Sequence, residues 1–161
     1  MAKVIGKEQH YFINEKNYKA YDEKGNLLQL YNSDSNIYYQ ITKDKAVQKI
    51  DASIATSQIF TVKKLKIKET IAGYSCNAIE VTTDEATTTY FYAPSIKINA
   101  DVYKKHNYGE WNKILKATNG SLPLKFSMIN YKQGFITWTC TAVSIKKQKL
   151  TEEDFDIPSD L

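Results

Sequence analysis

Short runs of apolar and β-branched residues alternate with polar turn clusters along the first fifty positions of the chain. The turn clusters are rich in Asn, Asp and Gly, which favour tight reversals of the backbone. Closely spaced runs of this kind predict short strands in an antiparallel meander. We expect these strands at residues 4–13, 18–21, 27–31, 37–42 and 46–50. The segment that follows, residues 51–58, is ambiguous, because Asp51 can cap one short helical turn.

Longer strands are predicted in the middle and near the end of the chain. Pro94 should end the third of them, because proline cannot donate a hydrogen bond to a sheet. In the first, the apolar alternation slips by one residue at Lys63-Lys64, which indicates a β-bulge there. The expected ranges are residues 59–70, 74–83, 87–92, 124–131 and 135–147.

One helix interrupts this pattern. Asn99 or Asp101 can cap its start, and Asn119-Gly120 supplies a stop signal. Gly109 weakens the centre of the segment, so a helix that begins only after Gly109 is the alternative. The residues at helical spacing are Tyr103, Asn107, Trp111, Ile114, Leu115 and Thr118.

The last strand is apolar on both of its faces over part of its length. Phe135 and Val143 fall on one face, whereas Trp138 and Cys140 fall on the other. A sheet with water on one side would alternate more cleanly. We therefore expect the helix to cover one face, and the N-terminal strands or a bound apolar ligand to cover the other. The prediction is one mainly β domain built on an antiparallel sheet.

Composition narrows the classes of function. All 22 basic residues are lysine, and the formal net charge is +4. Specific nucleic-acid recognition normally uses arginine for bidentate contacts, so its absence argues against a nucleic-acid partner. No segment reaches the roughly 18 apolar residues that a membrane-spanning helix requires. The 12 tyrosines and 6 phenylalanines suit cross-strand pairs in a sheet and also the lining of an apolar site.

No catalytic constellation stands out. The two histidines, His10 and His106, have no metal-ligand spacing to other residues, and nucleophile-elbow and phosphate-loop motifs are absent. We expect no enzymatic activity, no metal and no cofactor. The lysine run at Lys63, Lys64, Lys66 and Lys68 has two interpretations. It is a patch for anionic lipid head groups or an acidic partner, or a solvated face that protects a sheet edge.

The two cysteines, Cys76 and Cys140, both fall in predicted strands. They lack the spacing of a metal site or a redox pair. They are a candidate disulfide or two buried thiols. A disulfide requires neighbouring strands with Cα atoms within about 7 Å.

An ordered set of motifs resembles exported bacterial proteins of unknown function that are grouped with the outer-membrane lipoprotein-sorting (LolA/LolB-like) β-clam superfamily. The resemblance covers roughly residues 60–160 and is compatible with the N-terminal meander. The motifs are Ile71-Ala72-Gly73-Tyr74-Ser75-Cys76, Tyr90-Phe91-Tyr92-Ala93-Pro94, Gly120-Ser121-Leu122-Pro123-Leu124-Lys125 and Phe155-Asp156-Ile157-Pro158.

The resemblance implies a strongly curved antiparallel half-barrel with one or two short covering helices, formed by residues 1–161 as a single domain. It also implies an exported, periplasmic protein whose signal peptide lies outside this chain, either alone or together with a first strand. Characterised relatives of the fold carry lipid-modified or other apolar molecules. We therefore expect a non-catalytic binding domain for a lipid, a lipoprotein acyl chain or another apolar ligand. The alternative is a structural or interaction domain of the cell envelope, whose apolar face is closed by its own helix or by dimerisation.

The candidate ligand-binding residues come from the helix and the later strands. If the helix covers the sheet face of Trp138, the two tryptophans lie near one another around a pocket; otherwise both are plain core. The candidates are Trp111, Leu115, Phe126, Met128 and Trp138.

Overall fold

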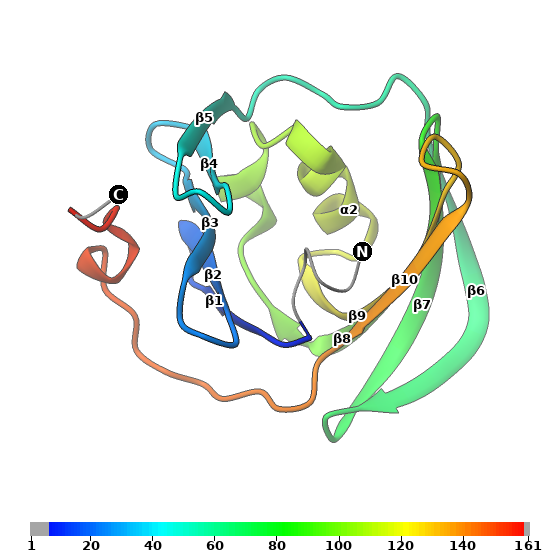
Figure 1. Cartoon of the computed structure of the whole chain (residues 1–161). Coiled ribbons are helices and arrows are strands. Elements are labelled where there is room, and N and C mark those ends of the chain that lie inside the picture. The colour runs from blue at the N-terminus through cyan, green and yellow to red at the C-terminus, as the bar shows by residue number, and fades with distance from the viewer. Residues whose placement is uncertain (1–6, 160–161) are drawn as a thin grey trace. The chain divides into compact units, whose positions relative to one another are not determined.

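Two antiparallel sheets of five strands each and one short α-helix make up most of the ordered structure of residues 7–159, which the computed structural model describes (Figure 1). The mainly β, antiparallel class expected from the sequence is confirmed. The sequence analysis expected one sheet, whereas the chain forms two. Residues 52–59 carry no strand, so the hydrogen-bonding ladder is not continued from one sheet to the next.

The first sheet is the N-terminal meander. Its strands are hydrogen-bonded in sequence order, each antiparallel to the next, because short polar turns join them. The first predicted strand begins in residues 4–6, which lie outside the described residues. The five strands are β1 (Gln9–Ile13), β2 (Asn17–Asp22), β3 (Leu27–Asn32), β4 (Ile37–Ile41) and β5 (Val47–Asp51).

The second sheet contains the longer strands in the order β10-β9-β8-β7-β6, so β6 and β10 are its edges. Strands β6 and β7 bend visibly along their length (Figure 1). The strands are β6 (Phe60–Ile71), β7 (Tyr74–Thr83), β8 (Ala86–Lys97), β9 (Ser121–Asn130) and β10 (Ile136–Thr141).

The chain divides into two compact units. One comprises Met1–Ile54 with Gln148–Leu161 and holds the first sheet and the 3-10 turn η3 (Glu153–Phe155). The other comprises Ala55–Lys147 and holds the second sheet and the remaining helical turns. Each unit has its own buried side chains: Tyr31 and Leu30 in the first, Ile79 and Leu115 in the second.

Three local expectations for the second sheet were wrong. Strand β8 continues past Pro94 to Lys97, because the β8–β9 register is irregular there and the proline interrupts no regular ladder. The bulge in β6 lies between Leu65 and Lys68 rather than at Lys63-Lys64. The lysines of β6 are all exposed, so they do not indicate which residues of the strand face the interior. The sequence pattern therefore places the bulge at the wrong position. Strand β10 ends at Thr141 instead of continuing to residue 147.

The helical region is broken rather than continuous. It consists of the 3-10 turns η1 (Ala100–Tyr103) and η2 (Tyr108–Glu110), followed by the helix α2 (Trp111–Ala117). Gly109, inside η2, has a φ of 64°, and the regular helix begins only at Trp111, which confirms the start after this glycine. The Asn99 side chain accepts a hydrogen bond from the Asp101 amide, as expected of a cap.

The stop signal after α2 also acts as expected. The Gly120 amide donates to the Leu115 carbonyl at 2.8 Å, and Gly120 has a φ of 75°. A Cβ atom at this position would lie 2.6 Å from the Ile98 carbonyl oxygen. Only glycine therefore fits the turn that leads from α2 into β9. Within residues 7–159 no helix is both long enough and apolar enough to cross a bilayer.

Candidate apolar binding face

Three of the five candidate ligand-binding residues lie together on one face of the second sheet. Trp138 in β10 is directly opposite Met128 in β9, and Cys140 is opposite Phe126. Directly opposed residues of an antiparallel pair point to the same side of the sheet. Tyr90 in β8 is opposite Phe126 and extends the group by one strand. We call Tyr90, Phe126, Met128 and Trp138 the aromatic face.

The sequence of β9 and β10 makes this region two-sided. Between the residues of the aromatic face lie Ser127 and Thr139, which point to the opposite side because side chains alternate along a strand. Their hydroxyl groups are hydrogen-bonded to each other at 2.8 Å. In β9 and β10 the large side chains of Phe126, Met128 and Trp138 therefore lie on one side and the hydroxyl pair on the other, and these three apolar side chains are each only half-buried.

The environment of the aromatic face has low polarity. The Tyr90 and Phe126 rings have centroids 6.2 Å apart, in tilted contact. Burial raises the pKa of Tyr90 to about 12, because the phenolate form is poorly solvated there. Ile79 and Val81 of β7 continue the same side of the sheet and are buried. This side of the sheet is thus apolar, buried at β7 and partly exposed at β9 and β10.

Helix α2 lies on the concave side of the second sheet (Figure 1). Its Lys113 ammonium group lies 5.2 Å from the ring centroid of Phe60, at the start of β6. Phe60 is opposite Thr83, which shares a face of β7 with Ile79 and Val81. The helix therefore covers the side of the sheet that carries the aromatic face.

The two helical candidates differ in accessibility. Leu115 is 0% exposed and belongs to the core of its unit. Trp111, the first residue of α2, is half-buried. Of these two, Trp111 alone presents surface to a ligand without rearrangement of the fold.

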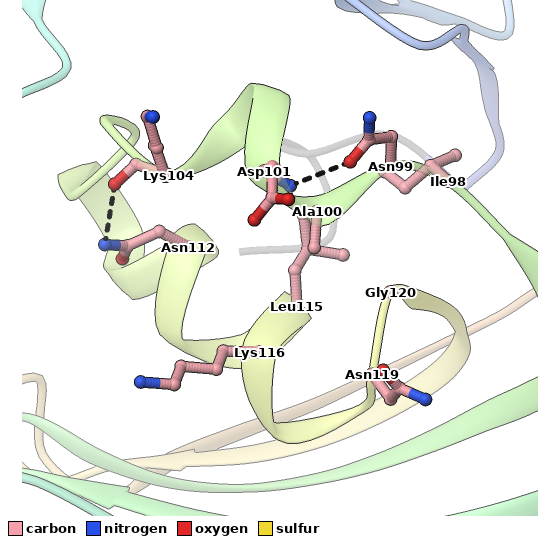
Figure 2. Close-up of a pocket in the computed structure, with 10 residues that line it drawn as sticks. All are labelled: Ile98, Asn99, Ala100, Asp101, Lys104, Asn112, Leu115, Lys116, Asn119 and Gly120. Carbon is pink, nitrogen blue, oxygen red and sulfur yellow. Dashed lines mark hydrogen bonds between the residues drawn. The ribbon is translucent and has the colours of Figure 1, made fainter.

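A separate hollow of about 630 Å³ lies between η1, α2 and the start of β9 (Figure 2). Of the five candidates, only Leu115 lines it, together with mostly polar side chains. In Figure 2 the Asn112 side chain donates to the Lys104 carbonyl, at 3.3 Å, and Asn99 accepts from the Asp101 amide. This polar lining does not suit an acyl chain. No residue of the aromatic face lines the hollow, so the two sites are distinct. Its lining residues are Ile98, Asn99, Ala100, Asp101, Lys104, Asn112, Leu115, Lys116, Asn119 and Gly120.

A buried carboxylate beside α2 was not anticipated from the sequence. Glu110 is 3% exposed and accepts hydrogen bonds from the amides of Thr56 and Ser57, at 3.1 and 2.8 Å. Its second oxygen forms an ion pair with Lys113 at 2.8 Å. These contacts attach the segment before β6 to the start of α2. A glutamate in a helical pattern normally indicates a solvated position, so no sequence signal marks this role.

The two histidines differ in their burial. His10 is exposed in β1, whereas His106 is buried, and burial lowers the pKa of His106 to about 4. His106 is therefore neutral at pH 7. Among residues 7–159, no three His, Cys, Asp or Glu side chains are grouped as a metal site would require.

The candidate disulfide is excluded in this fold. Both cysteines are free: Cys76 is buried in β7, and Cys140 is exposed in β10. Strands β8 and β9 lie between them, and the register places Cys140 in line with Ile79 rather than with Cys76, so the two cysteines are not on neighbouring strands as a disulfide would require. The sequence places both residues in strands correctly but does not specify which strands are neighbours.

Comparison with known proteins adds one finding. The model of a family described as a domain of unknown function (DUF4412) matches residues 18–161. No curated protein and no solved structure matches the chain. The resemblance to the lipoprotein-sorting β-clam superfamily therefore stays a prediction.

Proposed function

Since the chain belongs to the DUF4412 family, whose description assigns no function, we propose a function from the site: it is a non-catalytic module that binds an apolar molecule on the aromatic face. The observation that carries the proposal is the register of β9 and β10. It aligns Phe126, Met128 and Trp138 on one side of the sheet, where each is only half-buried.

The energetics favour a ligand with a flexible hydrocarbon part. Removing apolar surface from water contributes about 0.8 kcal/mol for each buried methylene group. An acyl chain that covered the margins of Met128 and Trp138 would also complete the burial of those two side chains. A polar ligand would instead have to give up its hydration against Tyr90 and Phe126.

We further propose, from the motif resemblance, that the chain is exported and acts in the periplasm on a lipid or a lipoprotein acyl chain. The bent strands of the second sheet and the helix on its concave side are compatible with the half-barrel that the resemblance implies. Of the motif Phe155-Asp156-Ile157-Pro158, Phe155 ends the 3-10 turn η3 and is buried.

The exposed thiol of Cys140 provides a direct test. It is opposite Phe126, whereas the Cys76 thiol is buried, so an environment-sensitive fluorophore can be attached at Cys140 alone. Titration with palmitate should give a saturable blue shift of its emission. The matched control carries Thr139→Cys and Cys140→Ser, which moves the label to the hydroxyl side and should remove the shift. A folded, labelled protein with no saturable response at Cys140 would contradict the proposal.

A second function is favoured by a different observation. At the turn between β9 and β10 the side chains of Ile129, Tyr131 and Phe135 are exposed, and Phe135 is 71% exposed. The Tyr131 and Phe135 rings lie 6.1 Å apart and form one small patch. The chain would then be a structural or interaction domain that associates through this patch. Light scattering after size exclusion should show a dimer that Phe135→Ser converts to a monomer.

A further inference from the structure

Strand β6 presents an unusual concentration of positive charge at a free sheet edge. It pairs only with β7 in the part of the chain that the structure describes, so its outer edge has no partner strand there. All four lysines of the strand are exposed, and none of them forms an ion pair within residues 7–159. We call Lys63, Lys64, Lys66 and Lys68 the lysine edge.

Nearby acidic groups leave the lysine edge largely uncompensated. Glu69, in the same strand, is held by the Lys125 ammonium group at 2.9 Å. Glu80 of β7 is opposite Lys63 in the register, and it is the one carboxylate in β7 that faces a residue of the lysine edge. The edge therefore carries a clear positive excess and attracts an anionic surface over about a Debye length, roughly 8 Å at physiological salt.

The β-bulge changes what the edge can bind. Between Leu65 and Lys68 the pairing with β7 is interrupted, which leaves Lys66 and Ile67 outside the regular ladder. A bulge disrupts the row of backbone groups that an added strand would need, so an extended peptide is a poor match for this edge.

Exposed aliphatic side chains lie among the lysines. Ile67 in the bulge is 51% exposed, and Val62 is 41% exposed. The long lysine side chains can place their ammonium groups at the head groups while an aliphatic side chain enters the interfacial region of the bilayer. Segments that bind membrane surfaces combine these two kinds of residue. A nucleic acid would favour arginine or exposed aromatic rings, and β6 offers neither beyond the half-buried Phe60.

We propose that the lysine edge docks the chain on a bilayer surface that contains anionic phospholipid. The lysines contact head-group phosphates, and Ile67 and Val62 enter the interface between them. Docking requires no ligand on the aromatic face, so it stands independently of the proposed binding of an apolar molecule.

Flotation of the full chain with vesicles tests the docking. The chain should float with vesicles of phosphatidylcholine and phosphatidylglycerol, not with phosphatidylcholine alone, and high salt should weaken the association. The triple variant Lys64→Gln, Lys66→Gln and Lys68→Gln should bind about a hundredfold more weakly, because each lysine near an anionic surface contributes about a fivefold factor.

A matched control separates the lysine edge from general charge. The triple variant Lys146→Gln, Lys147→Gln and Lys149→Gln removes the same charge from exposed positions outside the strands and should bind nearly as the unmodified chain does. Ile67→Ser leaves the charge unchanged and should still weaken binding. The proposal is overturned if folded protein does not float with anionic vesicles, or if both triple variants lose binding equally. It is also overturned if Ile67→Ser has no effect while heparin competes fully, since the edge would then be a general polyanion site.

Discussion

The carboxylate of Glu110 accepts a hydrogen bond from the backbone amide of Ser57 at 2.8 Å, across more than fifty residues of sequence. Both groups are buried. Glu110 itself has a φ of 59°, a left-handed conformation that is uncommon for a residue with a side chain. The contact fixes the chain just before β6 to the turn from which α2 begins, and so helps to set the position of α2 within its unit.

Replacement of Glu110 should therefore lower the free energy of unfolding substantially. Glu110→Ala leaves the amides of Thr56 and Ser57 without their acceptor, which costs about 1–3 kcal/mol for a buried group. Glu110→Gln keeps an acceptor oxygen and loses mainly the ion pair with the partly exposed Lys113, so its loss should be about 1 kcal/mol or less. Urea unfolding measures both values. Equal stability of Glu110→Ala and the unmodified chain would show that the contact does not matter.

The turn after α2 provides a paired glycine experiment. Gly120 and Gly134 have nearly the same φ, 75° and 74°, but only Gly120 lies close to another backbone segment. Gly134→Ala should cost about 1–2 kcal/mol, the usual penalty of a left-handed residue with a Cβ atom. Gly120→Ala should cost clearly more, because its Cβ atom would lie 2.6 Å from the Ile98 oxygen. Thermal unfolding of the two variants compares them, and equal losses would refute the steric explanation.

Buried His106 should make stability fall in mild acid. Burial lowers its pKa to about 4, whereas an unfolded histidine titrates near 6.5. The unfolded chain therefore takes up the proton first as the pH falls. The contribution of neutral His106 to the free energy of unfolding is complete above about pH 6.5 and is lost as the pH falls from about 6.5 to 4. The loss amounts to about 3 kcal/mol at pH 4.

The variant His106→Gln isolates this contribution. Its unfolding free energy should depend less on pH than that of the unmodified chain, and the difference should develop between pH 7 and 4. Guanidinium unfolding at several pH values gives both curves. Parallel curves for the two proteins would mean that His106 does not titrate as its burial implies.

The two thiols should react at very different rates. Cys140 is exposed and should be alkylated quickly in the folded chain, whereas Cys76 is buried and should react only after unfolding. Burial raises the pKa of both thiols and so lowers the thiolate fraction of each, which means that the difference in rate comes from accessibility. Thiol titration of unreduced protein should find one group when native and two in denaturant. Finding none in denaturant would mean that the cysteines are bridged after all.

Local pattern was sufficient for most of the strands. The range of β7, residues 74–83, was predicted without error, because Gly73 and Asp84 mark its ends. The start of α2 also follows from Gly109, a purely local signal. Elements of this kind are determined by residues that lie within a few positions of one another in the chain.

Relationships between distant segments could not be predicted in the same way. The excluded bridge between Cys76 and Cys140 depends on the strand order β10-β9-β8-β7, which no pattern within a single strand specifies. The complete burial of Leu115 and the contact of Glu110 with Ser57 depend on how α2 packs. The alignment of Met128 with Trp138 required both the pairing and the register of two strands.

That alignment leads to a prediction on ligand affinity. Trp138 lies half-buried in the edge strand β10, so Trp138→Ala should lower the unfolding free energy less than a fully buried tryptophan would, by less than about 3 kcal/mol. It should weaken palmitate binding at the aromatic face by at least about tenfold, because it removes about 1.4 kcal/mol or more of apolar contact. The Cys140 fluorophore reports the affinity. Thr139→Ala, a neighbouring change on the hydroxyl side, is the control and should leave the affinity unchanged. If the folded Trp138→Ala protein binds palmitate as tightly as the control does, any palmitate site lies elsewhere, since no ligand in contact with Met128 could avoid the side chain directly opposite it.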